Sequence, residues 1–308
     1  MSDLRIVSLL PSATEIVAAV GMADRLVGRS HQCDFPAQVR HLPALSATKV
    51  RLDGTSRDID RRVNEIIAQG VSVYRVDAER LRALRPDVIL TQTQCAICAV
   101  TPADLEDALC EWTGMAPVLV SLEPNDLADV WGDMRKVGEA LGAEAAAERA
   151  VAGLQGRLAT IRATADRAAY RPRVAAIEWI DPLMAGGNWM PELIEAAGGD
   201  SLFATPGQHS PWLDWAALAA ADPDVILLLP CGFTIDQSLA DVPLLAARPE
   251  WAGLSAVRRG QVFVIDGHHY FNRPGPRLVE SAEMIAEILH PDRFAFGHEG
   301  VGWVRLHH

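Results

Sequence analysis

The chain has 308 residues, of which 49% are hydrophobic, and 28 basic against 40 acidic residues give a net charge of −12. This length exceeds one small core and suits two lobes of ordinary size, and the apolar content excludes a disordered chain. The acidic balance argues against nucleic-acid binding through the whole surface, because phosphate contacts need clustered Lys and Arg.

The first half of the chain alternates short apolar runs with amphipathic segments. Strands are expected at residues 5–10, 25–30, 71–77, 87–92 and 116–123, and helices at 12–21, 57–70, 78–86 and 102–114. The first helix has Ser12 or Thr14 as its expected N-cap and ends at Gly21. Strands that alternate with helices predict a mostly parallel sheet covered on both faces.

A long stretch without strand signal follows. One helix is expected from Asn125, as N-cap, to Gly142, and the next spans 143–167, roughly 37 Å at about 1.5 Å per residue. A second α/β series then has strands expected at 173–180, 224–230 and 262–267, and helices at 191–199, 213–223 and 275–291. We therefore expect two Rossmann-like α/β lobes, residues 1–142 and 171–308, bridged by one long helix within 143–170.

The phrase "PDVIL" occurs once in each half, at 86–90 and at 223–227, between a helix and a loop that bears cysteine. This predicts a duplicated architecture, although a helix followed by Pro-Asp and a strand is also common in other α/β proteins. In open parallel sheets, ligands bind beyond the carboxyl ends of the strands. Two such sheets joined by a stiff helix are expected to face each other across a ligand cleft.

Aromatic residues gather in the loops that follow the second-half strands. Only 6% of the chain is aromatic, yet these loops contain Trp179, Trp189, Trp212, Trp215, Phe233, Tyr270 and Phe271. Because loops are normally polar, this set indicates a platform for a large flat or apolar ligand. The alternative is that some of the tryptophans pack beneath the loops.

The first-half loops combine histidine with cysteine. His31, Cys33, Cys95 and Cys98 offer the donor types of a metal site, including one C-x-x-C pair. Their spacing is not that of a zinc finger, and the C-x-x-C pair does not open a helix as a redox dithiol usually does. Structural zinc, a dithiol and simple packing of small thiols are the three alternatives. An odd count of five cysteines makes a poor disulfide framework.

No catalytic residue is assigned. The sequence has no G-x-S-x-G motif, and the glycine pairs at 186–187 and 198–199 lack the dinucleotide-binding pattern. Glu178 and Asp181 could form paired carboxylates, but neighbours on an extended segment point to opposite faces. These motifs give little support for catalysis, and an enzyme of unknown reaction is the third hypothesis.

Five stretches have a familiar pattern: "RIVSLLPSATEIVAAVG", "LVGRSHQCDFP", "RPDVILTQTQCAICAV", "GGNWMPELIEAAGG" and "ADPDVILLLPCGF". They resemble the cobalamin-binding branch of the substrate-binding proteins of ABC importers, the class III periplasmic binding protein-like group. The resemblance covers almost the whole chain. It implies two α/β lobes bridged by one long helix, a corrinoid or related metal chelate held between the lobes, no required cofactor, and an ABC permease as partner.

The resemblance also implies site residues. Its ligand-facing candidates are Pro11, Ser12, His31, Cys33, Asp34, Gln94, Cys95, Cys98, Trp179, Trp189, Trp212, Phe233, Tyr270, Phe271 and Arg273. Members of this group present one acidic residue on each lobe to the permease. Glu106 in the first lobe and Glu192 or Glu195 in the second are the counterparts expected here, with a solvated helix face as the alternative.

Two features depart from this group. The opening "MSDLRIVSLLPSATE" has no positive run before a long apolar stretch, so neither a secretory signal nor membrane insertion is expected. The sequence as it stands predicts a cytoplasmic protein, or a periplasmic one if it is a trimmed form. The cysteine-rich loops are the second departure. The alternative hypothesis is therefore a cytosolic metal or metallocofactor-binding protein that uses His31, Cys33, Cys95 and Cys98.

Overall fold

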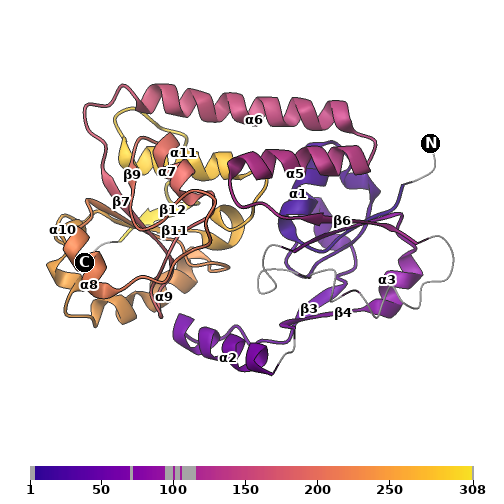
Figure 1. Cartoon of the computed structure of the whole chain (residues 1–308), viewed down its shortest axis with the longest axis horizontal. Helices are drawn as coiled ribbons and strands as arrows, with labels where there is room; N and C mark the ends of the chain where they lie inside the picture. Colours follow the sequence, from indigo (N-terminus) through magenta and orange to yellow (C-terminus); the bar gives the residue numbers. More distant parts are fainter. Residues whose placement is uncertain (1–3, 70–71, 94–99, 101–104, 106–115, 307–308) are drawn as a thin grey trace. The chain divides into compact units, whose positions relative to one another are not determined.

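The computed structural model of the chain describes residues 4–69, 72–93, 100, 105 and 116–306. The chain forms two compact units (Figure 1). Unit 1 comprises Met1–Asp53, Arg61–Pro124 and Ala128–Gly153, and unit 2 comprises Gly54–Asp60, Asn125–Leu127 and Leu154–His308. Each unit has its own sheet and core, so the predicted α/β class is confirmed. The expected cleft and the boundaries at 142 and 171 stay predictions.

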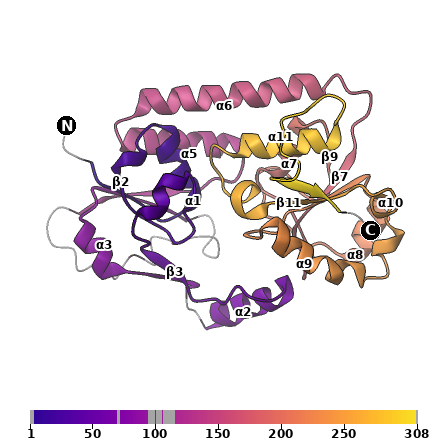
Figure 2. The ribbon, with the colours of Figure 1, turned by 180° about the vertical axis from the view of Figure 1, so that it is seen from behind.

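Unit 1 is built on a four-stranded parallel sheet in the order β2-β1-β5-β6. The strand β2 and the helices α1 and α3 of this unit are labelled in Figure 2. Its strands are β1 (Ile6–Ser8), β2 (Leu26–Arg29), β5 (Val88–Gln92) and β6 (Val118–Leu122). Its helices include α1 (Pro11–Ala19), α3 (Ala78–Leu84) and α5 (Leu127–Ala140), and a separate antiparallel ribbon joins β3 (Ser46–Thr48) to β4 (Tyr74–Val76). Leu81 of α3 packs with Val7 and Ile89 in the core.

Unit 2 has a larger sheet in the order β12-β11-β10-β7-β8, with β9 paired to β7. The central strands β7 (Arg173–Trp179), β10 (Val225–Leu228) and β11 (Val262–Ile265) are parallel, whereas β8 (Met184–Ala185) and β12 (Trp303–Arg305) run antiparallel to their neighbours. The strand β9 (Asp200–Ser201) pairs in parallel. The helices are α7 (Met190–Ala196), α8 (Trp215–Ala221), α9 (Ile235–Ala246), α10 (Ser255–Arg258) and α11 (Leu278–Leu289).

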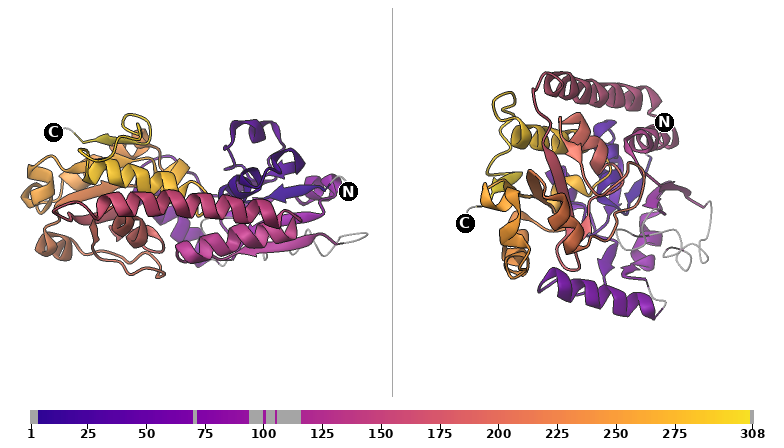
Figure 3. Two further views of the ribbon diagram at one scale, coloured as in Figure 1. Left: turned by 90° about the horizontal axis from the view of Figure 1, so that it is seen from above. Right: turned by 60° about the vertical axis from the view of Figure 1, so that its left-hand side comes forward.

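The long helix predicted at 143–167 is α6 (Glu144–Ala165), which has 22 residues. Its Val151, Leu158 and Ile161 are buried, as the helical spacing predicted. Within unit 1 the helix packs closely against α5, and within unit 2 it runs beside α11, where Arg157 forms an ion pair with Glu283 at 2.7 Å (Figure 3). The helix therefore contributes residues to both units.

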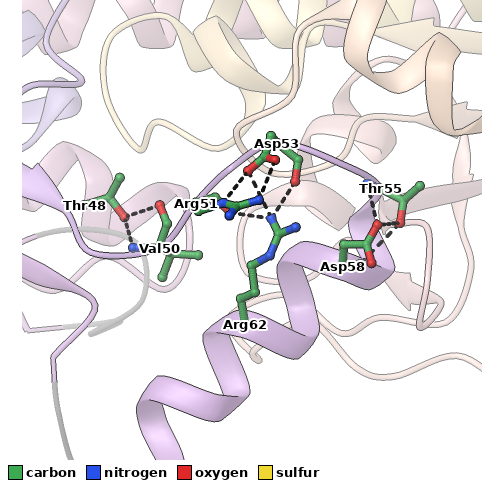
Figure 4. A network of polar contacts seen from close by, with 7 residues as sticks. All are labelled: Thr48, Val50, Arg51, Asp53, Thr55, Asp58 and Arg62. Atoms are coloured by element: carbon green, nitrogen blue, oxygen red, sulfur yellow. Dashed lines mark hydrogen bonds and ion pairs between the residues drawn. The ribbon is translucent and has the colours of Figure 1, made fainter.

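The helix α2 (Ser56–Ala68) also contributes residues to both units. Thr55 and Asp58 form a capping box, in which the backbone N–H of Thr55 donates to Asp58 Oδ2 at 3.3 Å and that of Asp58 donates to Thr55 Oγ1 at 3.2 Å (Figure 4). Further along, Arg62 donates from Nη1 to the carbonyls of Arg51, at 2.8 Å, and Asp53, at 2.5 Å (Figure 4). These contacts fix the chain that enters the helix.

The "PDVIL" phrase of unit 1 links a helix end to a strand start. Arg5, which precedes β1, donates from Nε to the carbonyl of Leu84, the last residue of α3, at 2.7 Å. The backbone N–H of Arg5 donates to Asp87 Oδ2 at 2.8 Å. The guanidinium thus satisfies a free carbonyl at the helix C-terminus, where a positive charge is favourable.

The phrase of unit 2 makes the same contacts. Arg173, the first residue of β7, donates from Nη1 to the carbonyl of Ala221, the last residue of α8, at 2.7 Å. Its backbone N–H donates to Asp224 Oδ2 at 2.9 Å. Both helices end in a left-handed residue just before the proline, Arg85 with φ 44° and Asp222 with φ 42°. The duplicated architecture predicted from the repeated phrase is confirmed.

Several expectations about elements were wrong or incomplete. The N-cap of α1 is Leu10, because Pro11 occupies the first helical position, so Ser12 and Thr14 lie inside the helix. The helix α9 was missed because Pro243 interrupts its pattern, although Thr234 and Gln237 form a capping box that marks its start. The strands β3, β8, β9 and β12 were missed because they have only two or three residues. The helix expected at 102–114 lies outside the described residues.

We predict that Asp224→Ala destabilises the protein by about 1–3 kcal/mol, because a charge-assisted network loses its half-buried acceptor. Asp224 accepts from the N–H of Arg173 and from the Tyr170 hydroxyl at 2.6 Å, and its carboxylate lies 3.7 Å from Arg259. Thermal and urea unfolding measure the change. Asp292→Ala is the matched control, since that side chain is 76% exposed. Equal effects of the two substitutions would contradict the assigned role.

A second prediction concerns Asp133 on α5, which is buried and accepts the backbone N–H of Glu123 at 3.1 Å. Burial raises the pKa of this carboxyl from 3.8 to about 6. The folded protein therefore holds the proton more tightly than the unfolded chain, and stability falls as pH rises through the window from about 4 to 6. Above that window the ionised carboxylate destabilises the fold.

Asp133→Asn keeps an acceptor for Glu123 and removes the charge. We expect a higher melting temperature than wild type at pH 7.5 and a difference that shrinks towards pH 4, measured by thermal unfolding across that range. The control is Asp129→Asn, an exposed carboxylate on the same helix. A difference in melting temperature that does not depend on pH would contradict the prediction.

Candidate functional site

The three central strands of unit 2 end together, because β7, β10 and β11 are parallel and paired in register. We call the ends of these strands and the segments after them, residues 178–182, 230–233 and 267–273, the carboxyl end of unit 2. Trp212 is included, because its backbone bridges Met184, the residue that pairs with Trp179. Two of these segments touch: the rings of Trp179 and Phe233 meet edge to face, with centroids 5.3 Å apart. The sequence predicted function at these loops, and the fold brings their aromatic residues together.

Trp179 presents an unusual donor at this place. Its side chain is half-buried, and its indole Nε1 is enclosed without a hydrogen-bond partner among the described residues. Buried N–H donors are rarely left without an acceptor, because the lost hydrogen bond costs about 1–3 kcal/mol. The nitrogen therefore marks a position where an acceptor on a bound molecule would be stabilising.

The carboxylates near β7 are engaged in structural contacts. The Ser210 hydroxyl donates to Glu178 Oε2 at 3.0 Å and accepts the backbone N–H of Gly187 at 3.0 Å. A side chain at Gly187 would collide with the backbone of Ser210, so only glycine fits. Asp181 forms an ion pair with Arg57. Glu178 and Asp181 thus hold segments together and do not form an acid–base pair.

The third segment of this end is η5, a short π-helical turn at Gly267–Phe271. Asp266 accepts the backbone N–H groups of His268 and His269, both at 2.9 Å, and His269 Nδ1 lies 2.7 Å from its other oxygen. Burial alone would raise the pKa of Asp266, but these hydrogen bonds hold it below the ordinary value. An ionised Asp266 therefore fixes the turn that carries Tyr270.

The predicted aromatic set divides by burial. Trp189 is buried and donates from Nε1 to the carbonyl of Phe271 at 2.8 Å, and Phe271 itself has no exposed surface. Phe233 is also buried, whereas Trp212 is 64% exposed. Tyr270 is half-buried under the guanidinium of Arg277, 4.0 Å from the ring centroid. The accessible aromatic surface thus comes from Trp179, Trp212 and Tyr270, and the others support it.

Arg273 lies beneath this surface. Its guanidinium is buried, and Nη2 lies 3.3 Å from Nε2 of His268.

In unit 1, the first strand ends in a buried polar network. Thr14 donates from Oγ1 to Ser8 Oγ at 2.8 Å, and its hydroxyl lies 3.0 Å from Cys33 Sγ. Cys33 and Ser12 are buried, and Pro11 is half-buried. Cys33 thus packs as a small buried side chain among hydroxyl groups. Simple packing was one of the three alternatives for the cysteines.

His31 follows the second strand of unit 1. Its Nδ1 lies 2.9 Å from Ser46 Oγ, and that hydroxyl contacts Ser30 Oγ at 3.2 Å, an arrangement that suits the tautomer with the proton on Nδ1. Nε2 is then a lone pair, enclosed without a partner among the described residues. Burial, with the nearby Arg29 cation, lowers the pKa of His31 and keeps the ring neutral. A neutral imidazole nitrogen of this kind can ligate a metal.

Several predicted site residues are not placed. Gln94, Cys95, Cys98 and Glu106 lie outside the described residues, so the metal site of His31, Cys33, Cys95 and Cys98 stays a prediction. Asp34 is half-buried in the loop after His31. Within either unit taken alone, the described His, Cys, Asp and Glu side chains form no cluster of three with metal-binding spacing.

The two acidic residues expected to face a permease differ. Glu192 is half-buried and accepts the backbone N–H of Leu127, the first residue of α5, at 2.8 Å, while burial raises its pKa. Glu195 is exposed on α7. The geometry therefore favours Glu195 over Glu192 as a carboxylate that a partner could reach.

Comparison with known proteins supports this picture. A family model described as periplasmic binding protein matches residues 6–268. The "Uncharacterized ABC transporter substrate-binding lipoprotein YvrC" of Bacillus subtilis (strain 168) is 24% identical over 94% of this chain and 81% of its own length. The "Vitamin B12-binding protein" of Vibrio parahaemolyticus serotype O3:K6 (strain RIMD 2210633) is 23% identical over 92% of this chain and 88% of its own.

A solved structure agrees on the fold. The "Periplasmic heme-binding protein RhuT from Roseiflexus sp. RS-1 in apo form" has a TM-score of 0.68 and 24% identity, and the match covers 94% of this chain and 98% of that one. These relatives are binding proteins rather than enzymes, as the resemblance of the sequence implied. No helix among the described residues is long and apolar enough to cross a membrane.

Proposed function

This chain belongs to the periplasmic binding protein family, and we propose that it is the substrate-binding protein of an ABC importer for a corrinoid such as vitamin B12. The observation that carries the proposal is the aromatic surface at the carboxyl end of unit 2. Trp179, Trp212 and Tyr270 offer ring faces and edges there, and a flat macrocycle with apolar edges matches them.

The polar groups of the same end suit a corrinoid as well. The Trp179 indole N–H has no protein acceptor among the described residues, and the side chains around a corrin ring carry many amide carbonyls that could accept it. The relatives include a protein named for binding vitamin B12. Chemistry and relatedness thus support the same ligand.

The test is a titration of the full-length protein with cyanocobalamin, followed by calorimetry and by the visible spectrum. We expect binding that Trp179→Ala weakens at least tenfold, because an aromatic wall and a donor are lost together. Trp179→Phe keeps an aromatic ring but removes the indole N–H, so it measures the contribution of that donor alone. Trp251→Phe, a buried tryptophan of the same unit outside the carboxyl end, is the matched control. No binding at high micromolar cobalamin would contradict the proposal.

One observation favours a second ligand, an iron tetrapyrrole. His31 carries a neutral Nε2 lone pair without a partner among the described residues, and imidazole nitrogen is a common ligand of haem iron. A relative in structure is named as a haem-binding protein. His31 Nε2 would ligate the iron of haem, whereas a corrinoid bound at the aromatic surface does not require this nitrogen.

Haem titration separates the two ligands. If ferric haem is bound through His31, His31→Ala shifts the Soret band and weakens binding at least tenfold, while Trp212→Ala leaves the band position unchanged. The control His209→Ala removes an exposed histidine whose Nδ1 contacts the carbonyl of Ser210, outside unit 1. A Soret band that is the same in wild type and His31→Ala would remove haem ligation by this residue.

The remaining parts of the proposal concern the partner and the place of work. An ABC permease is the expected partner, and Glu195 is the exposed carboxylate of unit 2 that we expect to meet it. A location outside the cytoplasmic membrane follows from the family's role. We do not favour the cytosolic metal-protein alternative, because the relatives are transport proteins and Cys33 lies in a buried network.

A further inference from the structure

Unit 2 also contains a pocket with a volume of about 330 Å³. Its lining comes from α6, from α11 and from residues 293–296, and it includes none of the residues at the carboxyl end. The volume is at the lower end of the range for small-molecule sites, about 300–1,000 Å³, so a compact ligand is the expected occupant.

One side of the pocket is aromatic. The rings of Phe294 and Phe296 stack with centroids 5.7 Å apart and planes 21° from parallel. Phe296 is 43% exposed, while Ile161 of α6, also in the lining, is buried. A stacked pair with one ring open to solvent can continue onto a third ring.

The polar side of the pocket holds donors that the protein does not use. Arg293 contacts Asp292 at 3.8 Å, too far for a hydrogen bond, and makes no hydrogen bond through its guanidinium to the described residues. Arg157 donates from Nε and Nη2 to Glu283, at 3.3 and 2.7 Å, and Nη1 takes no part in this ion pair. The Thr164 hydroxyl, also in the lining, makes no side-chain hydrogen bond to the described part of the chain.

The carboxylate in the lining does not cancel these cations. Both oxygens of Glu283 are engaged, Oε1 by Arg157 and Oε2 by Nε2 of His298 at 3.1 Å. The hydrogen bond that His298 donates to Glu283 raises the pKa of this histidine, so it gains positive charge more readily than usual. Among the residues that line the pocket, two arginines stand against one carboxylate.

The wall that carries Phe296 is held in place. Glu287 of α11 accepts the backbone N–H groups of Gly297 and His298, and Trp303 donates to it from Nε1 at 3.2 Å. A fixed wall does not have to be ordered by the ligand, which favours binding.

We propose that this pocket binds a small aromatic carboxylate, whose ring stacks on Phe296 and whose carboxylate accepts hydrogen bonds from Arg293 and Thr164. Guanidinium and carboxylate form the strong, directional pair that such a ligand requires. The site is independent of the tetrapyrrole proposed above, since the two share no residue.

Calorimetry with 1-naphthoate tests the pocket on the full-length protein, with the neutral 1-naphthalenemethanol as comparison. We expect the carboxylate to bind with a dissociation constant of about 0.1–1 mM and the alcohol to bind at least about tenfold more weakly. An alcohol that binds as tightly as the carboxylate would overturn the proposal, and so would an absence of binding by naphthoate.

Two variants locate the binding. Arg293→Gln removes the cation and Phe296→Ala the exposed ring, and each is expected to weaken naphthoate binding about tenfold. The matched controls are Arg248→Gln, a half-exposed arginine elsewhere in unit 2, and Trp212→Ala, an exposed aromatic residue of the carboxyl end. Circular dichroism confirms folding of each variant. Loss of binding in Trp212→Ala with none in Phe296→Ala and Arg293→Gln would assign the probe to the carboxyl end and refute the pocket.

Discussion

The arrangement of each sheet depends on one repeated interaction between a helix end and a strand start. An arginine at the start of the first strand satisfies the last carbonyl of a helix, and the aspartate of "PDVIL" accepts the backbone N–H of that same arginine. The next strand is thereby fixed in register beside the first, Ile6 opposite Val88 in unit 1 and Val174 opposite Val225 in unit 2. Because this register is set at the amino ends, the carboxyl ends align, and the functional loops emerge together.

The sequence predicted most of this framework, because it resides in long regular patterns. The apolar runs of β5, β7 and β10 and the helical spacing of α6 are local signals that tertiary packing did not override. Elements of two or three residues, such as β8 and β9, have no periodicity to detect and form only because β7 offers an edge. The turn η5 was not predicted although its cause is local: Asp266 accepts the backbone N–H groups of His268 and His269 and contacts His269 Nδ1.

The candidate site was predictable in place but not in detail. Aromatic residues in strand-end loops marked the carboxyl end of unit 2, but the sequence does not show which tryptophan, Trp179 or Trp189, has an indole nitrogen without a protein partner. The difference lies in the partner of each indole nitrogen: Trp189 has the carbonyl of Phe271 inside the protein, and Trp179 has none among the described residues. Likewise, Glu192 and Glu195 look alike on a helix, but only Glu192 faces the start of α5, where an acidic group satisfies a free N–H.

In the pocket lined by α6, α11 and residues 293–296, hydrogen-bond partners also distinguish the groups that stabilise the fold from those that are available to a ligand. Glu283 and Glu287 have every oxygen occupied by the protein, so their role is to bind the C-terminal segment to α11 and α6. Arg293 and Phe296 sit on that fixed segment with little of their own bonding capacity used. Among the described residues, the Arg293 guanidinium makes no hydrogen bond and only a 3.8 Å contact with Asp292, so most of its hydrogen-bonding capacity would be used only when an anion with an aromatic ring is bound.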